Sequence, residues 1–323
     1  MILTVTPTPV LERFGVIDGP LTGGEVLRLR GVDACPGGCG VTVARLIYLA
    51  GHPVHAIFPA PEISQYLRMI GLLGIPHDHV PVAGPVQTRF LVADDSGRTT
   101  QFLDPAMPLD TAQLAQLRDL TVSRAEDAAW VVLGGPLPDV APTAWYVEVI
   151  RALALYHPTV GTAVATSGAP LRAVIRQLSA ITPSLLALTT TDIADMVPDC
   201  GIRGVERSLE DGGDLSLVRD AVTPLLEAGV SEVLVSGAPG TAMCLTQGST
   251  WIARSGAGSE TDAGRFRELL LAGYLMNHGS DDRMGRLSTA LAYASAETTA
   301  GSGELPTPDL IHPEQVTCTE LGS

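Results

Sequence analysis

The chain contains no lysine and only one asparagine, Asn277, although it has 323 residues. All 20 of its basic side chains are therefore arginine. Reactions that require a lysine ammonium group are excluded, whereas arginine still binds phosphate through two parallel N–H donors. A bias toward GC-rich codons accounts for this composition, and the chemical consequence holds whatever its origin.

Membrane-length apolar runs, a secretory signal and a disulfide framework are also missing. Glycine, proline or charge interrupts every apolar run, and residues 1–5 carry no basic segment. The five cysteines are odd in number and scattered, which favours reduced thiols in a cytoplasmic protein. The net charge of −15 argues against binding to a nucleic-acid backbone. A hydrophobic content of 46% indicates a compact globular chain.

Short runs typical of buried strands alternate with stretches of helical periodicity. The strand-like runs are residues 2–6, 54–58, 130–133, 162–165 and 233–236. The helical stretches are residues 41–49, 63–73, 141–155, 171–178, 215–228, 266–277 and 283–296. Strands and helices that alternate in this way form parallel sheets covered by helices on both faces. The sequence predicts an α/β fold with a mostly parallel central sheet.

Two segments interrupt this alternation. Residues 25–32 alternate in polarity, and residues 89–93 and 99–103 flank Asp95, Ser96 and Gly97, a pattern typical of a β-hairpin. They predict a small β layer outside the main sheet, formed by about 8–34 and 85–105 and acting as a lid. Residues 299–307 are a loop rich in glycine and proline. We expect residues 1–323 to form a single domain with this lid.

Individual motifs are ambiguous. Gly37 and Gly38 open a helix, and they either admit a substrate close to the backbone or form a structural turn. The nearby cysteines and histidines approximate zinc-finger spacing, but the helix over 41–49 separates Cys39 from His52, and we predict no metal site. The segment SGAPG, 236–240, follows a strand and shapes either a nucleotide pocket or a turn.

Taken in order, the motifs resemble the ribokinase/PfkB family of carbohydrate kinases, specifically its phosphofructokinase branch. They are ILTVTPTPVLE (2–12), PGGCGVTVAR (36–45), AIFPA (56–60), QTRF (87–90), GGPLP (134–138), ATSGAPL (165–171), SGAPG (236–240) and LLLAGYL (269–275). Each motif is weak alone, but the set follows the family order over nearly the whole chain. The resemblance implies a ribokinase-like fold, a β lid over the sugar site and a homodimer formed through that lid. It also implies ATP- and Mg²⁺-dependent phosphorylation of a phosphosugar such as a fructose phosphate.

The resemblance also assigns roles to residues. Glu12, Gly37, Gly38, Cys39 and Thr42 stand at positions that contact the sugar, and Arg28 and Arg89 stand where this branch places basic residues against its phosphate. Ser236, Gly237 and Gly240 match the nucleotide loop. The family's early Asn-Pro…Asp is represented by Thr8, Pro9 and Glu12. Its Lys-Pro-Asn…Glu segment, associated with nucleotide and magnesium, resembles Thr182, Pro183, Ser184 and Ala187, with Asp192 or Asp195 as a compensating acid.

The largest departure concerns the Gly-Ala-Gly-Asp turn. In the family this turn provides backbone N–H donors for the transferred phosphoryl group and an aspartate as the base. Counting without gaps from either side, its four positions fall on Arg265, Phe266, Arg267 and Glu268, while the similar SGAGSE at 255–260 would need a shift of nine residues. Either the site is rewired, with Glu268 as base and the arginines replacing N–H donors, or the helix start drifted and Phe266 fills the space.

Three functions remain open on this basis. The first is a pseudokinase that keeps a phosphosugar cleft but has lost efficient phosphoryl transfer, serving as a sensor or partner subunit. The second is an active ATP-dependent hexose-phosphate kinase with Glu268 as base. The third is a purely structural or dimerisation protein.

Overall fold

The computed structural model describes residues 1–96, 98–210, 212–237, 240–256, 263–296 and 303–321. Within that part, the main sheet has ten strands in the order β14-β13-β12-β11-β10-β9-β8-β1-β4-β5. They are β1 (Ile2–Val5), β4 (Val54–Ala60), β5 (His77–Pro81), β8 (Trp130–Gly134), β9 (Gly161–Ala165), β10 (Leu185–Thr189), β11 (Glu232–Ser236), β12 (Thr241–Leu245), β13 (Thr250–Ser255) and β14 (Val316–Leu321). The seven strands from β11 to β5 are parallel, and β12, β13 and β14 add antiparallel pairs at one edge. The predicted α/β class is confirmed.

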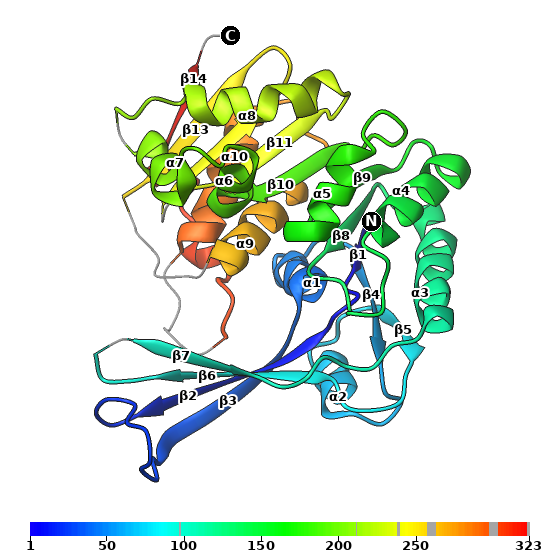
Figure 1. Cartoon of the computed structure of the whole chain (residues 1–323), viewed down its shortest axis with the longest axis vertical. Coiled ribbons are helices and arrows are strands. Elements are labelled where there is room, and N and C mark those ends of the chain that lie inside the picture. The colour runs from blue at the N-terminus through cyan, green and yellow to red at the C-terminus, as the bar shows by residue number, and fades with distance from the viewer. Residues whose placement is uncertain (97, 211, 238–239, 257–262, 297–302, 322–323) are drawn as a thin grey trace.

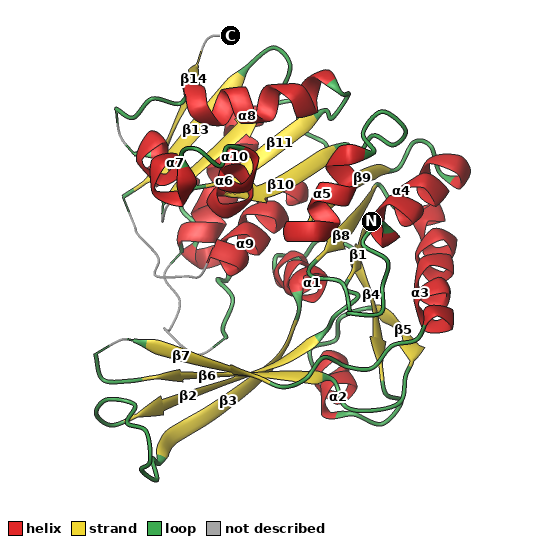
Figure 2. Cartoon of the chain, in the orientation of Figure 1, coloured by secondary structure: helices red, strands yellow, loops and turns green. Residues whose placement is uncertain are grey.

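Helices cover the sheet in two layers (Figures 1 and 2). Helix α1 packs against α9 on one side, and α3 packs against α4, which contacts α5, on the other. The helices are α1 (Cys39–Leu49), α2 (Gln65–Leu72), α3 (Thr111–Arg124), α4 (Trp145–Tyr156), α5 (Gly168–Arg176), α6 (Thr190–Met196), α7 (Gly201–Leu209), α8 (Ser216–Glu227), α9 (Ala263–Met276) and α10 (Arg283–Ser295). Short 3-10 turns occupy Ala125–Asp127, Pro308–Leu310 and Pro313–Gln315.

A separate four-stranded sheet extends from the body of the molecule (Figure 1). It has the order β3-β2-β6-β7 and consists of β2 (Val10–Ile17), β3 (Leu29–Gly37), β6 (Gln87–Ala93) and β7 (Thr99–Leu103). We call this sheet the lid. Its position agrees with the predicted β layer, but the expectation of a strand over 25–32 was wrong: β3 begins at Leu29 and continues to Gly37, and β2 was missed.

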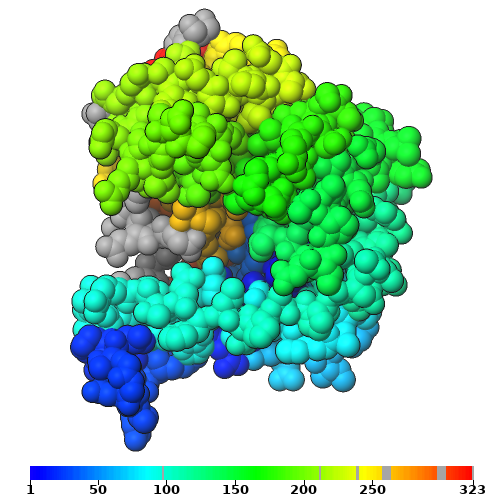
Figure 3. All heavy atoms as spheres, in the orientation of Figure 1, coloured from blue at the N-terminus to red at the C-terminus, as the bar shows by residue number. Residues whose placement is uncertain are grey.

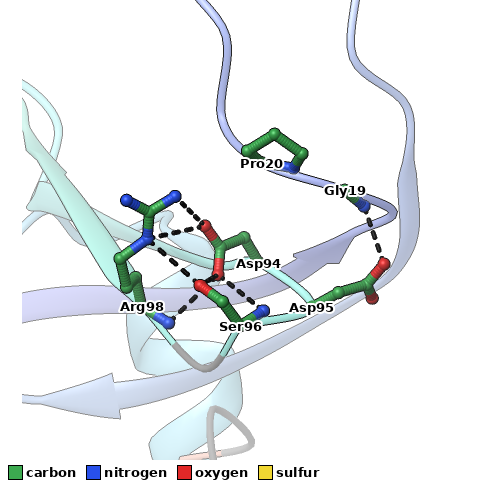
Figure 4. A pocket seen from close by; sticks show the side chains of 6 residues that line it. All are labelled: Gly19, Pro20, Asp94, Asp95, Ser96 and Arg98. Carbon is green, nitrogen blue, oxygen red and sulfur yellow. Dashed lines mark hydrogen bonds and ion pairs between the residues drawn. The ribbon is translucent and has the colours of Figure 1, made fainter.

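The turn between β6 and β7 is held by two aspartates (Figure 4). Asp94 accepts hydrogen bonds from Ser96 and Arg98, and Asp95 accepts one from the Gly19 N–H in the neighbouring loop. The predicted hairpin is therefore present, although its Gly97 lies outside the described residues. The SGAGSE segment lies largely outside them as well, and so does most of the predicted loop 299–307.

Residue patterns explain why the lid lies where it does. β1 is buried on both faces and ends at Val5, from which the chain passes directly into the lid. The lid returns through β3 to Gly38, whose φ of 100° favours glycine and which precedes the first residue of α1. The lid is thereby anchored at the carboxyl end of the central strand. Among the described residues, no helix combines the length and apolar character needed to cross a membrane.

Candidate active site

The carboxyl ends of β1, β9, β10 and β11 meet at one edge of the parallel sheet, beside the base of the lid. In open α/β sheets ligands bind in the crevice outside these strand ends. Helices α1 and α9 pack together, and a hydrogen bond from Arg265 to Thr42 joins their first turns at the same edge. Figure 3 shows a hollow between the lid strands, in cyan, and the green surface of the body, with orange α9 atoms and blue N-terminal atoms exposed inside it.

A carboxylate and two guanidinium groups bridge the lid to α9. Glu12 on β2 is 4% exposed and forms an ion pair with Arg89 on β6. The Glu12 Oε2 atom lies 3.8 Å from the Arg265 Nη1 atom, and Arg265 also donates to the Thr42 hydroxyl at 3.3 Å. The structure thus brings together Glu12, Thr42, Arg89 and Arg265, four residues that the sequence predicted for the site.

Arg45 was missed from the sequence. Its guanidinium donates to the Pro36 carbonyl at 3.0 Å and to the Gly303 carbonyl at 3.3 Å, next to the lid strand β3. Its charge is felt by Cys35, whose thiol contacts Glu12. Arg45 lies in the PGGCGVTVAR motif, but nothing in the spacing of that motif indicated a charge directed at the lid.

Glu268 lies among these groups with a perturbed carboxyl. Burial raises its pKa above the usual value of 4.5, while Arg265 lowers it and Glu12 raises it further. The side chain is partly exposed, but protein atoms surround the carboxyl closely enough for desolvation to dominate. A hydrogen bond from Thr42 opposes the shift. Burial also raises the pKa of the neighbouring Cys39 thiol, and the negative charge of Glu268 is the second largest cause of this rise. Both effects keep the thiol protonated.

Arg267 points to a different partner. Its Nη1 atom lies 3.4 Å from Asp192 Oδ2 and donates to the Ser167 hydroxyl at 2.9 Å and to the Thr166 carbonyl at 3.3 Å. The side chains of Arg267 and Asp192 are 9% and 2% exposed. The Arg267 Nε atom is buried without a hydrogen-bond partner among the described residues, which costs about 1–3 kcal/mol.

The start of α9 differs from expectation. The helix begins at Ala263, three residues before the predicted start, because Arg265, Phe266, Arg267 and Glu268 contain no glycine and are compatible with a helix. Only the first few N–H groups of a helix lack a helical acceptor, so the amides of Arg267 and Glu268 are already bonded within it. Phe266 is 3% exposed and lies in the main hydrophobic core, and that it fills the space of the family's glycines stays a prediction.

The glycines at the lid base have a steric role. A Cβ on Gly37 would lie 2.7 Å from the Glu12 carboxyl carbon, and one on Gly38 would lie 2.7 Å from Thr6 Cγ2 and 3.1 Å from the Thr8 carbonyl. These positions keep β2, β3 and α1 in close contact. Cys39 begins α1 and His52 follows its other end, as the sequence predicted.

The nucleotide-loop residues lie at the end of β11. Ser236 is buried and its hydroxyl donates to the Leu188 carbonyl, and the Gly237 N–H donates to the Thr241 carbonyl. Gly240 has a φ of 80° and follows positions 238–239, which lie outside the described residues. These two donors of the loop therefore bond within the protein.

The suggested magnesium segment needs a correction. Thr182, Pro183 and Ser184 precede β10, at the opposite end of the strand from the site. Asp192 follows β10, but its Oδ2 atom already accepts from the Thr189 N–H and hydroxyl and faces Arg267; Asp195 pairs with Arg172. Within the described residues, no group of three or more His, Cys, Asp or Glu side chains could hold a metal ion. These residues do not fit a magnesium-bound triphosphate.

Arg28 does not join the cluster within one chain. It precedes Leu29 at the outer end of β3, whereas Gly37 ends that strand at the lid base. Nine residues of extended strand span about 30 Å. The predicted contact of Arg28 with a phosphate would require a second chain.

Two surface pockets lie elsewhere. One, of about 280 Å³, is at the lid turn, lined by Gly19, Pro20, Asp94, Asp95, Ser96 and Arg98 (Figure 4). The other, of about 680 Å³, lies at the opposite end of the sheet, lined by Met1, Tyr48, Gly51, His52, Pro53, Val54 and Pro76. Neither contains a residue of the arginine–carboxylate cluster. Charge and burial, rather than pocket size, mark the site.

No family model matches the chain. It is 30% identical over 151 residues to the ATP-dependent 6-phosphofructokinase isozyme 2 of Mycobacterium tuberculosis. The aligned region covers 46% of this chain and 44% of that protein. The chain thus matches less than half the length of its curated relative.

Solved structures match over nearly the whole chain. Phosphofructokinase-2 of Escherichia coli in complex with substrates and products has a TM-score of 0.80 and 21% identity, covering 96% of both chains. A carbohydrate kinase from Agrobacterium tumefaciens has a TM-score of 0.67 and 15% identity, covering 99% of both. A tetrameric inhibited form of the E. coli enzyme gives 0.74 and 20%, covering 91% of this chain and 92% of that one.

These matches define the class: the protein has the ribokinase-like α/β fold, with a large sheet between helices and a smaller separate sheet. The resemblance to the phosphofructokinase branch of the PfkB carbohydrate kinases, predicted from eight ordered motifs, is confirmed by the curated relative and by the structural neighbours.

Proposed function

We propose that the protein binds a phosphorylated sugar between the lid and α9 and has lost efficient phosphoryl transfer. One observation carries this proposal: α9 begins before the four positions of the family's anion-binding turn, while arginines gather at the same place. A chain with a net charge of −15 concentrates four arginines here, against the carboxylates of Glu12 and Asp192 and the protonation-prone Glu268. Such a cluster attracts an anion.

The expected loss of activity is large. Removing a single anion-hole donor costs about 10²–10³ in rate. A misplaced general base costs about 10²–10⁴ more. Kinases turn over at about 1–100 s⁻¹, so both losses together leave a turnover of about 10⁻⁷–10⁻² s⁻¹. Magnesium binding, implied by the resemblance, belongs to this lost function because Asp192 and Asp195 already face Arg267 and Arg172, whereas ATP binding stays a prediction.

Ligand binding tests the retained cleft. Calorimetry and thermal shift with fructose 6-phosphate and with fructose separate a phosphate requirement from general sugar binding. A ligand at about 100 times its Kd stabilises the native state by about 2.7 kcal/mol. We expect fructose 6-phosphate to bind and fructose not to bind.

Variants locate that binding. Arg89→Ala weakens it by about 10–100-fold, since a hydrogen bond to a charged group contributes about 1.5–3 kcal/mol. Arg118→Ala, whose side chain is 35% exposed and pairs with Asp119, is the matched control and leaves binding unchanged. Absence of binding at millimolar fructose phosphates rejects the cleft.

The second candidate is an active hexose-phosphate kinase with Glu268 as base. Its support is the raised pKa of Glu268, because a base whose pKa approaches the working pH is the more effective. A coupled assay of ADP release decides between the two functions. If the wild type turns over and Glu268→Gln abolishes this turnover, the protein is an active kinase with Glu268 as base. If Glu268→Gln leaves turnover unchanged, Glu268 is not the base.

We also propose a homodimer formed through the lid. On the lid face opposite Glu12, the apolar side chains of Leu29 and Val32 on β3 and of Phe102 on β7 are exposed. Pairing of two lids would also bring Arg28 of one chain toward the other. Analytical ultracentrifugation of Phe102→Asp tests the interface, and a monomer is expected. If the wild type is itself a monomer, a dimerisation function is rejected, whereas a purely structural function is rejected when nucleotide or sugar phosphate raises the stability of the chain.

A further inference from the structure

The buried carboxylate of Asp192, in the first turn of α6 after β10, is paired with a cationic side chain of the protein, Arg267. The Asp192 side chain is 2% exposed, and Arg267 lies 3.4 Å away with 9% exposure. Burying a carboxylate to this extent is costly unless it is paired and hydrogen-bonded. Arg267 reaches it from the second turn of α9 and also bonds to Ser167 and Thr166 at the end of β9. One guanidinium therefore joins three segments at the carboxyl edge of the sheet.

We propose that the Arg267 guanidinium takes the place of a divalent metal ion at this edge, so that anions bind here without magnesium. The proposal goes beyond phosphosugar binding, and either can fail without the other. It follows from the disagreement between the described residues and the metal that the fold resemblance implies.

Contacts at one carboxylate oxygen of Asp192 already favour the guanidinium over a metal ion. Asp192 Oδ2 accepts from the Thr189 N–H at 2.9 Å and from the Thr189 hydroxyl at 2.8 Å, in addition to facing Arg267. Magnesium requires near-octahedral oxygen ligands and gives up its water reluctantly. The neighbouring Asp195 faces Arg172 at 3.3 Å and offers no second committed ligand.

The guanidinium retains donor capacity. Its Nε atom is buried without a hydrogen-bond partner among the described residues, and Ser167, the residue before α5, makes no side-chain capping bond to that helix. A Cβ added at Gly168 would meet no atom within 4 Å, so there is open space at the start of that helix. The chemical class of ligand that suits these groups is a phosphate monoester, bound as an anion by guanidinium and N–H donors.

Titration of the wild-type chain is the first test. Calorimetry with Mn²⁺, and thermal shift with Mg²⁺ or a chelator, should show neither stoichiometric binding nor a change in Tm. One Mn²⁺ per chain, lost in Asp192→Asn, overturns the proposal. This measurement needs no destabilised variant.

Rescue of a variant is the second test. Arg267→Ala leaves Asp192 without its cation and lowers Tm by about 5–10 °C. If the guanidinium stands in for a metal ion, millimolar Mn²⁺ or guanidinium ion recovers at least half of that loss. The double variant Arg267→Ala/Asp192→Asn is the matched control, and neither cation should rescue it.

The outcomes separate clearly. Rescue confined to the single variant supports the proposal, whereas a folded Arg267→Ala that no cation stabilises overturns it. If Arg267→Ala does not fold, Arg267→Lys replaces it: this variant keeps a charge and should remain insensitive to Mn²⁺, and a rise in its Tm with Mn²⁺ overturns the proposal. Fructose 6-phosphate binding measured with and without chelator is recorded separately, so failure of phosphosugar binding is distinguished from failure of the cation replacement.

Discussion

Glu12→Gln provides the sharpest test of how the cluster binds a phosphate. Glu12 holds Arg89 by an ion pair and lies 3.8 Å from Arg265, so its carboxylate occupies the two guanidiniums that a phosphate would use. At an effective dielectric constant of about 20, the attraction to Arg265 alone is about 4 kcal/mol before desolvation is subtracted. The amide keeps the shape of the side chain and removes the charge.

Two opposite effects are expected from this substitution. The free energy of unfolding falls by about 2–3 kcal/mol, because two partly buried guanidiniums lose their counter-charge. The affinity for phosphate rises about tenfold, equivalent to about 1.4 kcal/mol, because the competing carboxylate is gone. Urea denaturation measures the first effect, and calorimetry with inorganic phosphate and fructose 6-phosphate measures the second.

A matched control and a refuting result follow from the same structure. Asp94 is a buried lid carboxylate paired with Arg98 at the far turn, so Asp94→Asn should weaken the lid without changing phosphate affinity. If Glu12→Gln instead weakens fructose 6-phosphate binding and leaves inorganic phosphate unaffected, Glu12 contacts sugar hydroxyls, as the family resemblance implies. Our reasoning on competition would then be wrong.

Three further predictions concern pH, packing and thiols. Burial raises the pKa of Glu268 above 4.5, so the native state holds its proton more tightly than the unfolded chain and stability falls as pH rises through that window. Glu268→Gln should flatten this fall in urea titrations, and an unchanged profile refutes the assignment. Gly38→Ala should cost about 1–3 kcal/mol by calorimetry, because φ is 100° and Thr6 is in the way; a cost near zero contradicts the packing argument. Thiol labelling should show one fast cysteine, exposed Cys200, and Cys200→Ser should abolish that phase while buried Cys39 stays unreactive.

Alternation of strands and helices was sufficient to predict the fold class, because parallel strands buried on both faces are continuous apolar runs such as Ile2–Val5. The lid was only partly predictable. The strand Val10–Ile17 contains the charged residues Glu12 and Arg13. Adjacent charges are typical of loops, and only the neighbouring strands of the sheet show why they are accommodated here. Helix α3 was missed because its exposed face is polar and its start depends on a capping box at Asp110.

The sequence predicted which residues belong to the candidate site, but not all of the contacts between them. Motif order located Glu12, Arg89, Arg265 and Glu268, which the structure brings together, because a shared fold keeps the same strand ends adjacent. The pairing of Arg267 with Asp192 could not be read from the sequence, since 75 residues separate them and their contact depends on where α9 begins. The position of Thr182 was misjudged because a short apolar strand gives no sign of where it ends.

The outer strands of the two sheets differ in how they meet a neighbouring molecule. β5, at one margin of the main sheet, carries His77, Asp78 and His79 and ends at Pro81, which has no N–H to offer. Charges and proline in such a place discourage strand addition. β7 of the lid, Thr99–Leu103, has no charged side chain, and Phe102 and Leu103 are exposed. Strand addition is therefore favoured at the β7 edge of the lid over the β5 edge of the main sheet, and association at β7 should change access to the proposed sugar site.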